Sequence, residues 1–183
     1  SEVVSDETSE DVVVNDNYAK DKNYTVSGSF LGGKADDGVI LTDGIIPESE
    51  IAGSTVAFSG TGAINTIIVD LAKVYTDINK IVVGGVVVNG NREYGTVVIE
   101  VSTDGVNYTT LTGYEEKSEA ITSMMNNYIY NFASDVSARY VKISIKSADY
   151  VLTVGDIQVY GSGNTSDETS EVVSDDTTID ETS

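Results

Sequence analysis

The sequence ARYVKISIKSADYVLTVGDIQVYG, residues 138–161, contains two β-strand patterns in succession. In the first, apolar and polar residues alternate over residues 140–146, which is typical of a strand with one buried face. In the second, Ile157 and Val159 share one face and Asp156 lies on the other. The composition changes abruptly after this stretch, so we expect it to close a folded module.

Similar strand patterns precede this stretch, and each is bounded by turn residues such as Gly, Asn and Asp. About eight short strands without a sustained helical period predict an all-β fold, an antiparallel β-sandwich. A closed β-barrel is the alternative. Gly84 and Gly85 interrupt an apolar strand, which predicts a bulge or a close approach of two backbones. Residues 48–62 are expected to be rich in loops. Strands are expected at residues 24–26, 66–71, 80–88, 96–102, 107–111 and 128–132.

Two acidic, Ser/Thr-rich segments flank the predicted sandwich, at residues 1–16 and 162–183. They carry six and seven acidic residues and no Lys or Arg, so 13 of the 20 net negative charges lie in them. This composition cannot bury enough apolar surface to offset the entropy lost on ordering. We therefore expect disordered acidic tails that act as linkers, a domain at residues 17–161, and neighbouring domains on both sides in a longer chain.

The charge and composition also exclude several classes of function. A net charge of −20 argues against binding nucleic acid or anionic membranes. No apolar run approaches the ~20 residues of a membrane span, so we expect no membrane insertion. The chain has no Cys and no His, so the common catalytic triads and zinc sites cannot form. Two carboxylates can hydrolyse a glycoside, but no spacing marks such a pair. We expect a protein that is not an enzyme.

Six short motifs stand in the order of a known family. They are NYAK with YTVS (17–20 and 24–27), LTDG (41–44), IVDL (68–71), VSTDG (101–105), ARYVKI (138–143) and DIQVYG (156–161). Residues 17–161 thus resemble the discoidin, or coagulation factor 5/8 type C, domain. This family is a galactose-binding-like jelly roll and contains many bacterial carbohydrate-binding modules. The lack of cysteines favours a bacterial module.

The resemblance implies a structural calcium ion between the first loops and the last strand. The implied ligands are the side chains of Asp43 and Asp156, backbone carbonyls near Leu41 and Ile46, and a hydroxyl at Ser54 or Thr55. Asp156 stands where the family usually has Glu. Calcium takes six to eight hard oxygen ligands, and this set supplies that chemistry. The alternative for Asp43 is a turn aspartate that accepts hydrogen bonds from its own backbone.

The resemblance also implies a ligand site in the loops at one end of the sandwich, with residues 32–37, 89–94 and 112–125 as candidates. The most sugar-like cluster is Asn91, Arg92, Glu93 and Tyr94. Arg and Asn hydrogen-bond vicinal hydroxyls, and a tyrosine ring covers the apolar face of a pyranose. A polar hairpin tip without a ligand is the alternative. Tyr114 is a weaker candidate, and Met124 and Met125 are either an adaptable apolar contact or core.

The function implied by the resemblance is that of a non-catalytic carbohydrate-binding module. It would belong to a large extracellular multimodular bacterial protein, secreted or at the cell surface, and would target that protein to a polysaccharide or glycan. A weak site in such a protein gains from effective concentration. We expect the module to be monomeric. The alternative is a cell-surface adhesion or structural spacer domain that binds protein or no ligand.

Overall fold

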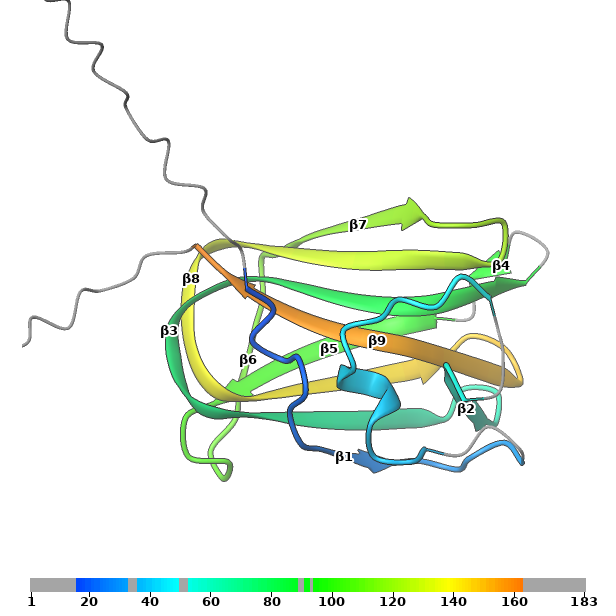
Figure 1. The fold of residues 1–183 in the computed structure, drawn as a ribbon, viewed down its shortest axis with the longest axis horizontal. Helices are drawn as coiled ribbons and strands as arrows, with labels where there is room; N and C mark the ends of the chain where they lie inside the picture. Colours follow the sequence, from blue (N-terminus) through cyan, green and yellow to red (C-terminus); the bar gives the residue numbers. More distant parts are fainter. Residues whose placement is uncertain (1–15, 33–35, 50–52, 89–90, 93, 163–183) are drawn as a thin grey trace, which may run out of the picture.

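The computed structural model describes residues 16–32, 36–49, 53–88, 91–92 and 94–162. These residues form an antiparallel β-sandwich with one short 3-10 helix, which confirms the predicted fold class (Figure 1). Most of both acidic segments lies outside the described residues. No helix in the described ranges is long and apolar enough to cross a membrane. The elements are β1 (Tyr24–Ser27), η1 (Ile40–Thr42), β2 (Val56–Ser59), β3 (Ile64–Val88), β4 (Asn91–Arg92), β5 (Tyr94–Ser102), β6 (Thr109–Thr110), β7 (Glu115–Ala120), β8 (Met125–Ser147) and β9 (Val151–Gly161).

Two long strands, β3 and β8, run through both layers of the sandwich (Figure 1). The first layer has the order β1–β3–β8–β5–β6 and uses the N-terminal part of β3 and the C-terminal part of β8. The second layer has the order β2–β9–β3–β8–β7 and uses the remaining parts of both strands. The segments expected at residues 66–71 and 80–88 are therefore one strand that bends.

An ion pair holds the bend between the layers. The register of β3 on β8 shifts between Asp70 and Tyr75, and Ala72 has a left-handed backbone with φ of 69°. Asp70 Oδ1 accepts hydrogen bonds from the Ala72 amide and from Arg139 Nε, both at 2.8 Å. Asp70 Oδ2 accepts a further bond from Arg139 Nη2 at 2.9 Å. These bonds with Arg139, more than any other contact, lower the pKa of Asp70.

The core lies between the two layers and follows the alternation seen in the sequence. Val141, Ile143 and Ile145 of β8 are fully buried, as are Ile157 and Val159 of β9. Tyr and Val side chains of β5 and the N-terminal part of β8 complete it. Residue alternation therefore identified the inner face of these strands correctly.

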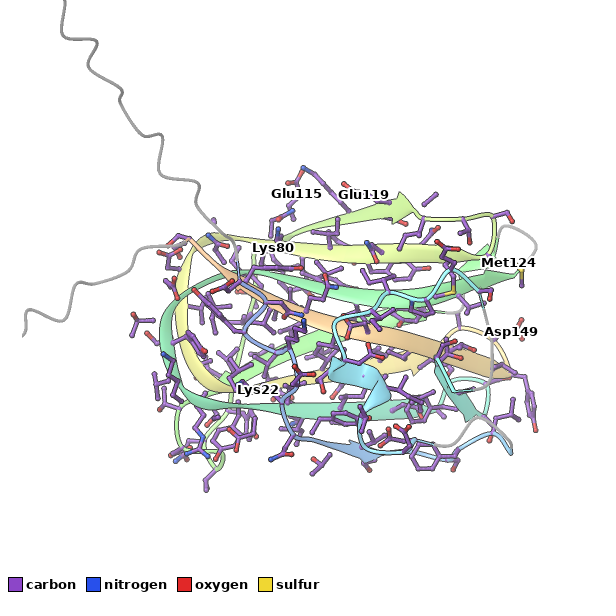
Figure 2. All side chains as sticks on the ribbon, viewed as in Figure 1. Lys22, Lys80, Glu115, Glu119, Met124 and Asp149 are labelled. Carbon is purple, nitrogen blue, oxygen red and sulfur yellow. The ribbon has the colours of Figure 1, made fainter. Side chains whose placement is uncertain are left out.

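Two passages differ from the expectation. Residues 48–62 were expected to be rich in loops and no strand was predicted there, but they contain β2, whose Phe58 is buried and stacks on Phe30. Residues 112–125 were a candidate loop but contain β7, an edge strand in which every residue is exposed. An exposed edge strand shows no apolar alternation, and its charges discourage pairing with other chains. Figure 2 shows Glu115 and Glu119 on the outer side of this strand.

The glycine pair marks an irregularity in β3, as predicted, and the close approach at Gly85 is by side-chain rings and not by a second backbone. The register of β3 on β9 shifts between Val83 and Gly85, which is a bulge. A Cβ atom on Gly85 would lie 2.8 Å from ring atoms of Tyr94 and of Tyr128. Only glycine allows these rings to approach the backbone so closely.

The two ends of the described module lie side by side. Asn17 Oδ1 accepts a hydrogen bond from the Val159 amide at 3.0 Å, and the Tyr18 amide donates to the Val159 carbonyl at 2.8 Å. The connections that follow β1, β2, β7 and β8, together with β4, lie at the opposite end of the sandwich (Figure 1). We call that opposite end the loop end.

Candidate functional site

Part of the predicted sugar-binding cluster lies at the loop end. Asn91 and Arg92 form β4, which pairs with Val88 and Val87 of β3. The structure describes the backbone of these two residues and not their side chains, and Glu93 lies outside the described residues. The pairing makes residues 91–92 the returning arm of a hairpin, so this part of the cluster does lie at a hairpin tip.

Tyr94 does not belong to an exposed sugar platform. Its side chain is 3% exposed, its ring stacks on Tyr128 with centroids 4.5 Å apart, and its hydroxyl donates to the Gly84 carbonyl at 2.9 Å. A ring covered in this way has no free face for a pyranose. The prediction that Tyr94 covers a sugar is therefore wrong, because β5 turns this residue into the core.

Tyr114 is not at the loop end. It lies just before β7, where Glu115 pairs with Asn131, whereas the loop end begins near Met125 on the same strand. Six residues of extended strand separate these levels, or roughly 20 Å. The Tyr114 hydroxyl donates to the Val97 carbonyl at 3.2 Å, and its ring meets Tyr130 edge-on. Burial raises the pKa of the Tyr114 phenol. These contacts make Tyr114 a packing residue.

The loop end exposes apolar side chains that the sequence reasoning did not single out as a group. Tyr150, in the turn between β8 and β9, is 61% exposed, and Phe30 and Met124 are 42% and 43% exposed. Figure 2 shows Met124 and Asp149 at this end. Met125, next to Met124, is fully buried and belongs to the core, while an apolar ligand contact by the exposed Met124 stays a prediction. The signal for Tyr150 was a lone aromatic residue in the turn sequence SADY.

The connections that carry these side chains are held by hydrogen bonds. Thr122 Oγ1 donates to the Glu48 carbonyl at 2.9 Å and accepts bonds from the amides of Met124 and Met125. The Asp149 carboxylate accepts a bond from the Tyr150 amide at 2.7 Å. The exposed Tyr150 and Met124 side chains therefore stand on fixed backbone, which lowers the entropy lost when a ligand binds.

Two of the predicted calcium ligands, Asp43 and Asp156, lie near each other, where the turn after η1 meets β9. Gly44, next to Asp43, donates its amide proton to Asp156 Oδ1 at 3.2 Å. Thr55 precedes β2, whose Val56 pairs with Val154, so Thr55 lies close to the level of Asp156. Asp43 Oδ1 also accepts a bond from the Ile45 amide at 2.7 Å, so the turn-aspartate alternative describes one of its oxygens.

The Asp156 carboxyl is unusual for a strand residue predicted to face outward. It is fully buried, and its Oδ2 has no hydrogen-bond partner among the described residues. Burial raises the pKa of Asp156 to about 6, and the nearby Asp43 carboxylate adds to the rise. Hydrogen bonds from the Gln158 side chain and the Gly44 and Ile157 amides offset part of this effect. A buried carboxylate without full compensation needs a proton or a cation.

These residues fit a hard cation in part. Asp156 supplies a buried oxygen without a partner, and Asp43 supplies a second carboxylate beside it. Leu41, in η1, and Ile46 lie in the segment that covers β9 and offer backbone carbonyls. The described residues contain no group of three or more acidic side chains arranged for a metal. Calcium at this position would therefore rely on carbonyl and hydroxyl oxygens for most of its ligands, which the chemistry of the ion permits.

A sequence profile of the F5/8 type C domain matches residues 44–157, more than half of the chain. The chain belongs to the F5/8 type C (discoidin) family. A search of curated protein sequences finds no match.

Solved structures with this fold include several carbohydrate-binding modules. Chitosan-binding module 2 of a Paenibacillus sp. IK-5 chitosanase/glucanase, solved with chitotriose, has 16% identity and a TM-score of 0.54 over 79% of this chain and 100% of that one. A Streptococcus pneumoniae fucose-binding module has 16% identity and a TM-score of 0.54, over 80% and 96%. The Clostridium perfringens module CpGH89CBM32-6 has 19% identity and a TM-score of 0.52, over 80% and 99%. At these identities the likeness concerns the fold.

Proposed function

We propose that residues 17–161 form a non-catalytic carbohydrate-binding module that targets a larger extracellular bacterial protein to a polysaccharide or glycan. The observation that carries the proposal is membership of the F5/8 type C family. It is supported by the fold shared with the chitosan- and fucose-binding modules. The same relatives, which come from bacteria, support the bacterial and extracellular setting.

The proposed site is the loop end, at the β4 hairpin and the turn that carries Tyr150. The exposed ring of Tyr150 offers an apolar face for a pyranose, and Asn91 and Arg92 bring amide and guanidinium groups that hydrogen-bond hydroxyls. The module's two ends meet at the other end of the sandwich, so the loop end is remote from both of them. A weak site placed in this way gains from the effective concentration set by the linkers.

The experiment that tests this proposal is a binding panel of soluble and insoluble glycans, including chitotriose and L-fucose. We expect at least one glycan to bind, and Arg92→Ala or Tyr150→Ala to remove most of that binding. Tyr150→Phe is the matched control, because it keeps the ring and should keep the affinity. Absence of binding to every glycan in the panel would overturn the proposal and favour a spacer or adhesion domain.

We also propose that Asp43 and Asp156 hold a structural calcium ion, together with carbonyl oxygens near Leu41 and Ile46 and the Thr55 hydroxyl. The unpartnered, buried Oδ2 of Asp156 supports this proposal. The ion would fix η1 and the following turn against β9. An ion that binds only the folded state must raise the free energy of unfolding.

A further inference from the structure

A pocket of about 350 Å³ opens on the outer face of the first layer, away from the loop end and from Asp156. It lies between β1, the N-terminal part of β3, the C-terminal part of β8 and the turn between β5 and β6. The polar and aromatic residues that line it include Asn23, Thr25, Asp70, Asp104, Tyr108 and Tyr140. Figure 1 shows β1 and the turn after β5 at the side of the sandwich, far from β4. We call this hollow the flank pocket.

The walls of the flank pocket are fixed by internal bonds. Asp104 accepts hydrogen bonds from the Ser102 hydroxyl at 2.9 Å and from the Val106 and Asn107 amides, both at 2.8 Å. These bonds, the Asn107 amide first, hold the pKa of Asp104 well below its usual range. Gly105 has φ of +76°, and a Cβ atom there would lie 3.0 Å from the Tyr140 ring. The turn at residues 104–107 therefore packs closely against the Tyr140 ring, and the pocket is preformed.

Several polar groups face the pocket without an internal partner. The Asn23 and Thr25 side chains and the Tyr108 and Tyr140 hydroxyls make no hydrogen bond with the described residues, although both rings carry a cation nearby. Asn23 and Thr25 are exposed, and the two tyrosines are half-buried. These groups provide donors and acceptors beside two aromatic rings, at a volume within the ~300–1,000 Å³ of small-molecule sites.

The charges around the pocket select the ligand class. Its lining contains two aspartates and neither Lys nor Arg among the described residues. Asp70 is neutralised by Arg139, while the nearby Lys142 is paired with Glu100 at 2.6 Å. Asp104 has no cation partner in the described part of the chain, and its carboxylate is held by hydrogen bonds, including one from Asn107 Nδ2 to Oδ2 at 2.7 Å, so it keeps its negative charge. This balance favours a neutral or amine-bearing ligand and disfavours an anionic one.

We propose that the flank pocket is a second saccharide-binding site, which takes a neutral or amine-bearing sugar residue. The Tyr108 and Tyr140 rings supply apolar area, and Asn23, Thr25 and Asp104 hydrogen-bond the hydroxyl or amine groups. The proposal rests on the proposed function only for the ligand class, because the pocket shares no residue with the loop end. Two sites on different faces would let one module bridge two polysaccharide chains.

The test is an NMR titration of the ¹⁵N-labelled full chain with chitotriose, with L-fucose, and with digalacturonate as an anionic control. We expect chitotriose or L-fucose to shift the amides of Thr25 and Gly105 saturably, and digalacturonate to leave them unchanged. Tyr108→Ala should weaken this binding about tenfold. Thr25→Val keeps the shape of the pocket and should weaken it as well. Tyr150→Ala, the same kind of change at the loop end, should leave it unaltered.

The outcomes separate this site from the loop end. Shifts confined to the loop end would overturn the second site and leave the proposed function intact. Shifts at Thr25 and Gly105 that survive both Tyr108→Ala and Thr25→Val would also overturn it. Shifts at the flank pocket alone, lost in these variants, would support the second site and overturn the loop-end assignment.

Discussion

Asp156 joins two features that seldom occur together in a carboxyl group without a bound ion: full burial and an oxygen without a partner. Its pKa is raised from 3.8 to about 6, mainly by burial. The folded chain therefore binds this proton more tightly than the unfolded chain does. Without calcium, the contribution of Asp156 to stability is complete below about pH 4 and is lost as the pH rises through 6, by about 3 kcal/mol.

Asp156→Asn tests both the proton and the ion. In EDTA we expect the variant to be more stable than the parent at pH 7, and similar to it at pH 4, because the amide has no charge to bury. Calcium chloride should raise the free energy of unfolding of the parent and not that of the variant. Urea unfolding at several pH values with and without calcium measures both effects.

Asp149→Asn, at an exposed aspartate of the loop end, is the matched control and should follow the parent in all conditions. Equal stabilisation of the parent and Asp156→Asn by calcium would contradict the calcium proposal. Parallel pH profiles in EDTA would contradict the raised pKa.

Tyr94→Phe tests the packing role of this tyrosine. Loss of the hydroxyl leaves the buried Gly84 carbonyl without that donor, so we expect the free energy of unfolding to fall by about 1–3 kcal/mol. Glycan affinity should not change. Tyr150→Phe, at an exposed hydroxyl, should change stability by less than about 0.5 kcal/mol. Unchanged stability of Tyr94→Phe would contradict the packing role of the hydroxyl.

Single-residue burial was the hardest property to predict from the sequence. Tyr94 follows a polar hairpin and reads as exposed, but its burial depends on Gly85 having no side chain and on Tyr128 of another strand. Asp156 reads as an outward acid, but residues that precede it by more than one hundred positions cover it. Alternation reports the face of a strand, and it carries no information on what covers that face.

Gly85 of β3 is the position where the strand backbone and two aromatic rings of the core approach each other most closely. A methyl group there would meet both the Tyr94 and Tyr128 rings. Neither ring can move easily, because they stack on each other and the Tyr94 hydroxyl is bonded to Gly84. We therefore expect Gly85→Ala to lower the free energy of unfolding by about 1–3 kcal/mol.

Gly32→Ala is the matched control for that substitution. No heavy atom lies within 4 Å of the Cβ position at Gly32, so the change should stay within about 0.5 kcal/mol. Chemical denaturation of both variants measures the difference. Equal effects of the two substitutions would contradict the constraint that the two rings place on Gly85.

Strands with one buried face and one exposed face were predictable from the sequence. Strands that are exposed on both faces, or buried on both faces, were not. The alternation of Val141, Ile143 and Ile145 marks β8 because one side of that strand meets the core and the other meets solvent. β7 has solvent on both sides, so its sequence EEKSEA carries no period. β2 is buried on both sides around Phe58 and is only four residues long, too short for a period to show.

For the whole molecule, the sandwich should be independent of its acidic segments. A fragment of residues 16–162 contains every described residue and omits most of the charge outside the fold. We expect its melting temperature at moderate salt to lie within about 2 °C of that of the full chain. At low salt the fragment should be the more stable of the two, because it lacks the repulsion among the acidic residues.

Differential scanning calorimetry at two ionic strengths checks this expectation. The parent in high salt is the control for repulsion, since screening should bring the two melting temperatures together. A fragment that melts well below the full chain at every ionic strength would show that the segments contribute to the fold. The domain bounds predicted from composition would then be wrong.

The hydrogen bonds that Val159 makes with Asn17 and Tyr18 bring the start and the end of the sandwich together. A fold closed in this way can be spliced into a surface turn of a host protein with only a narrow gap to span. The inserted module would then project from the host surface, with its loop end pointing outward. A pulling force on the host chain would act on the inserted module where its two ends meet, and would place little load on the interior of the module.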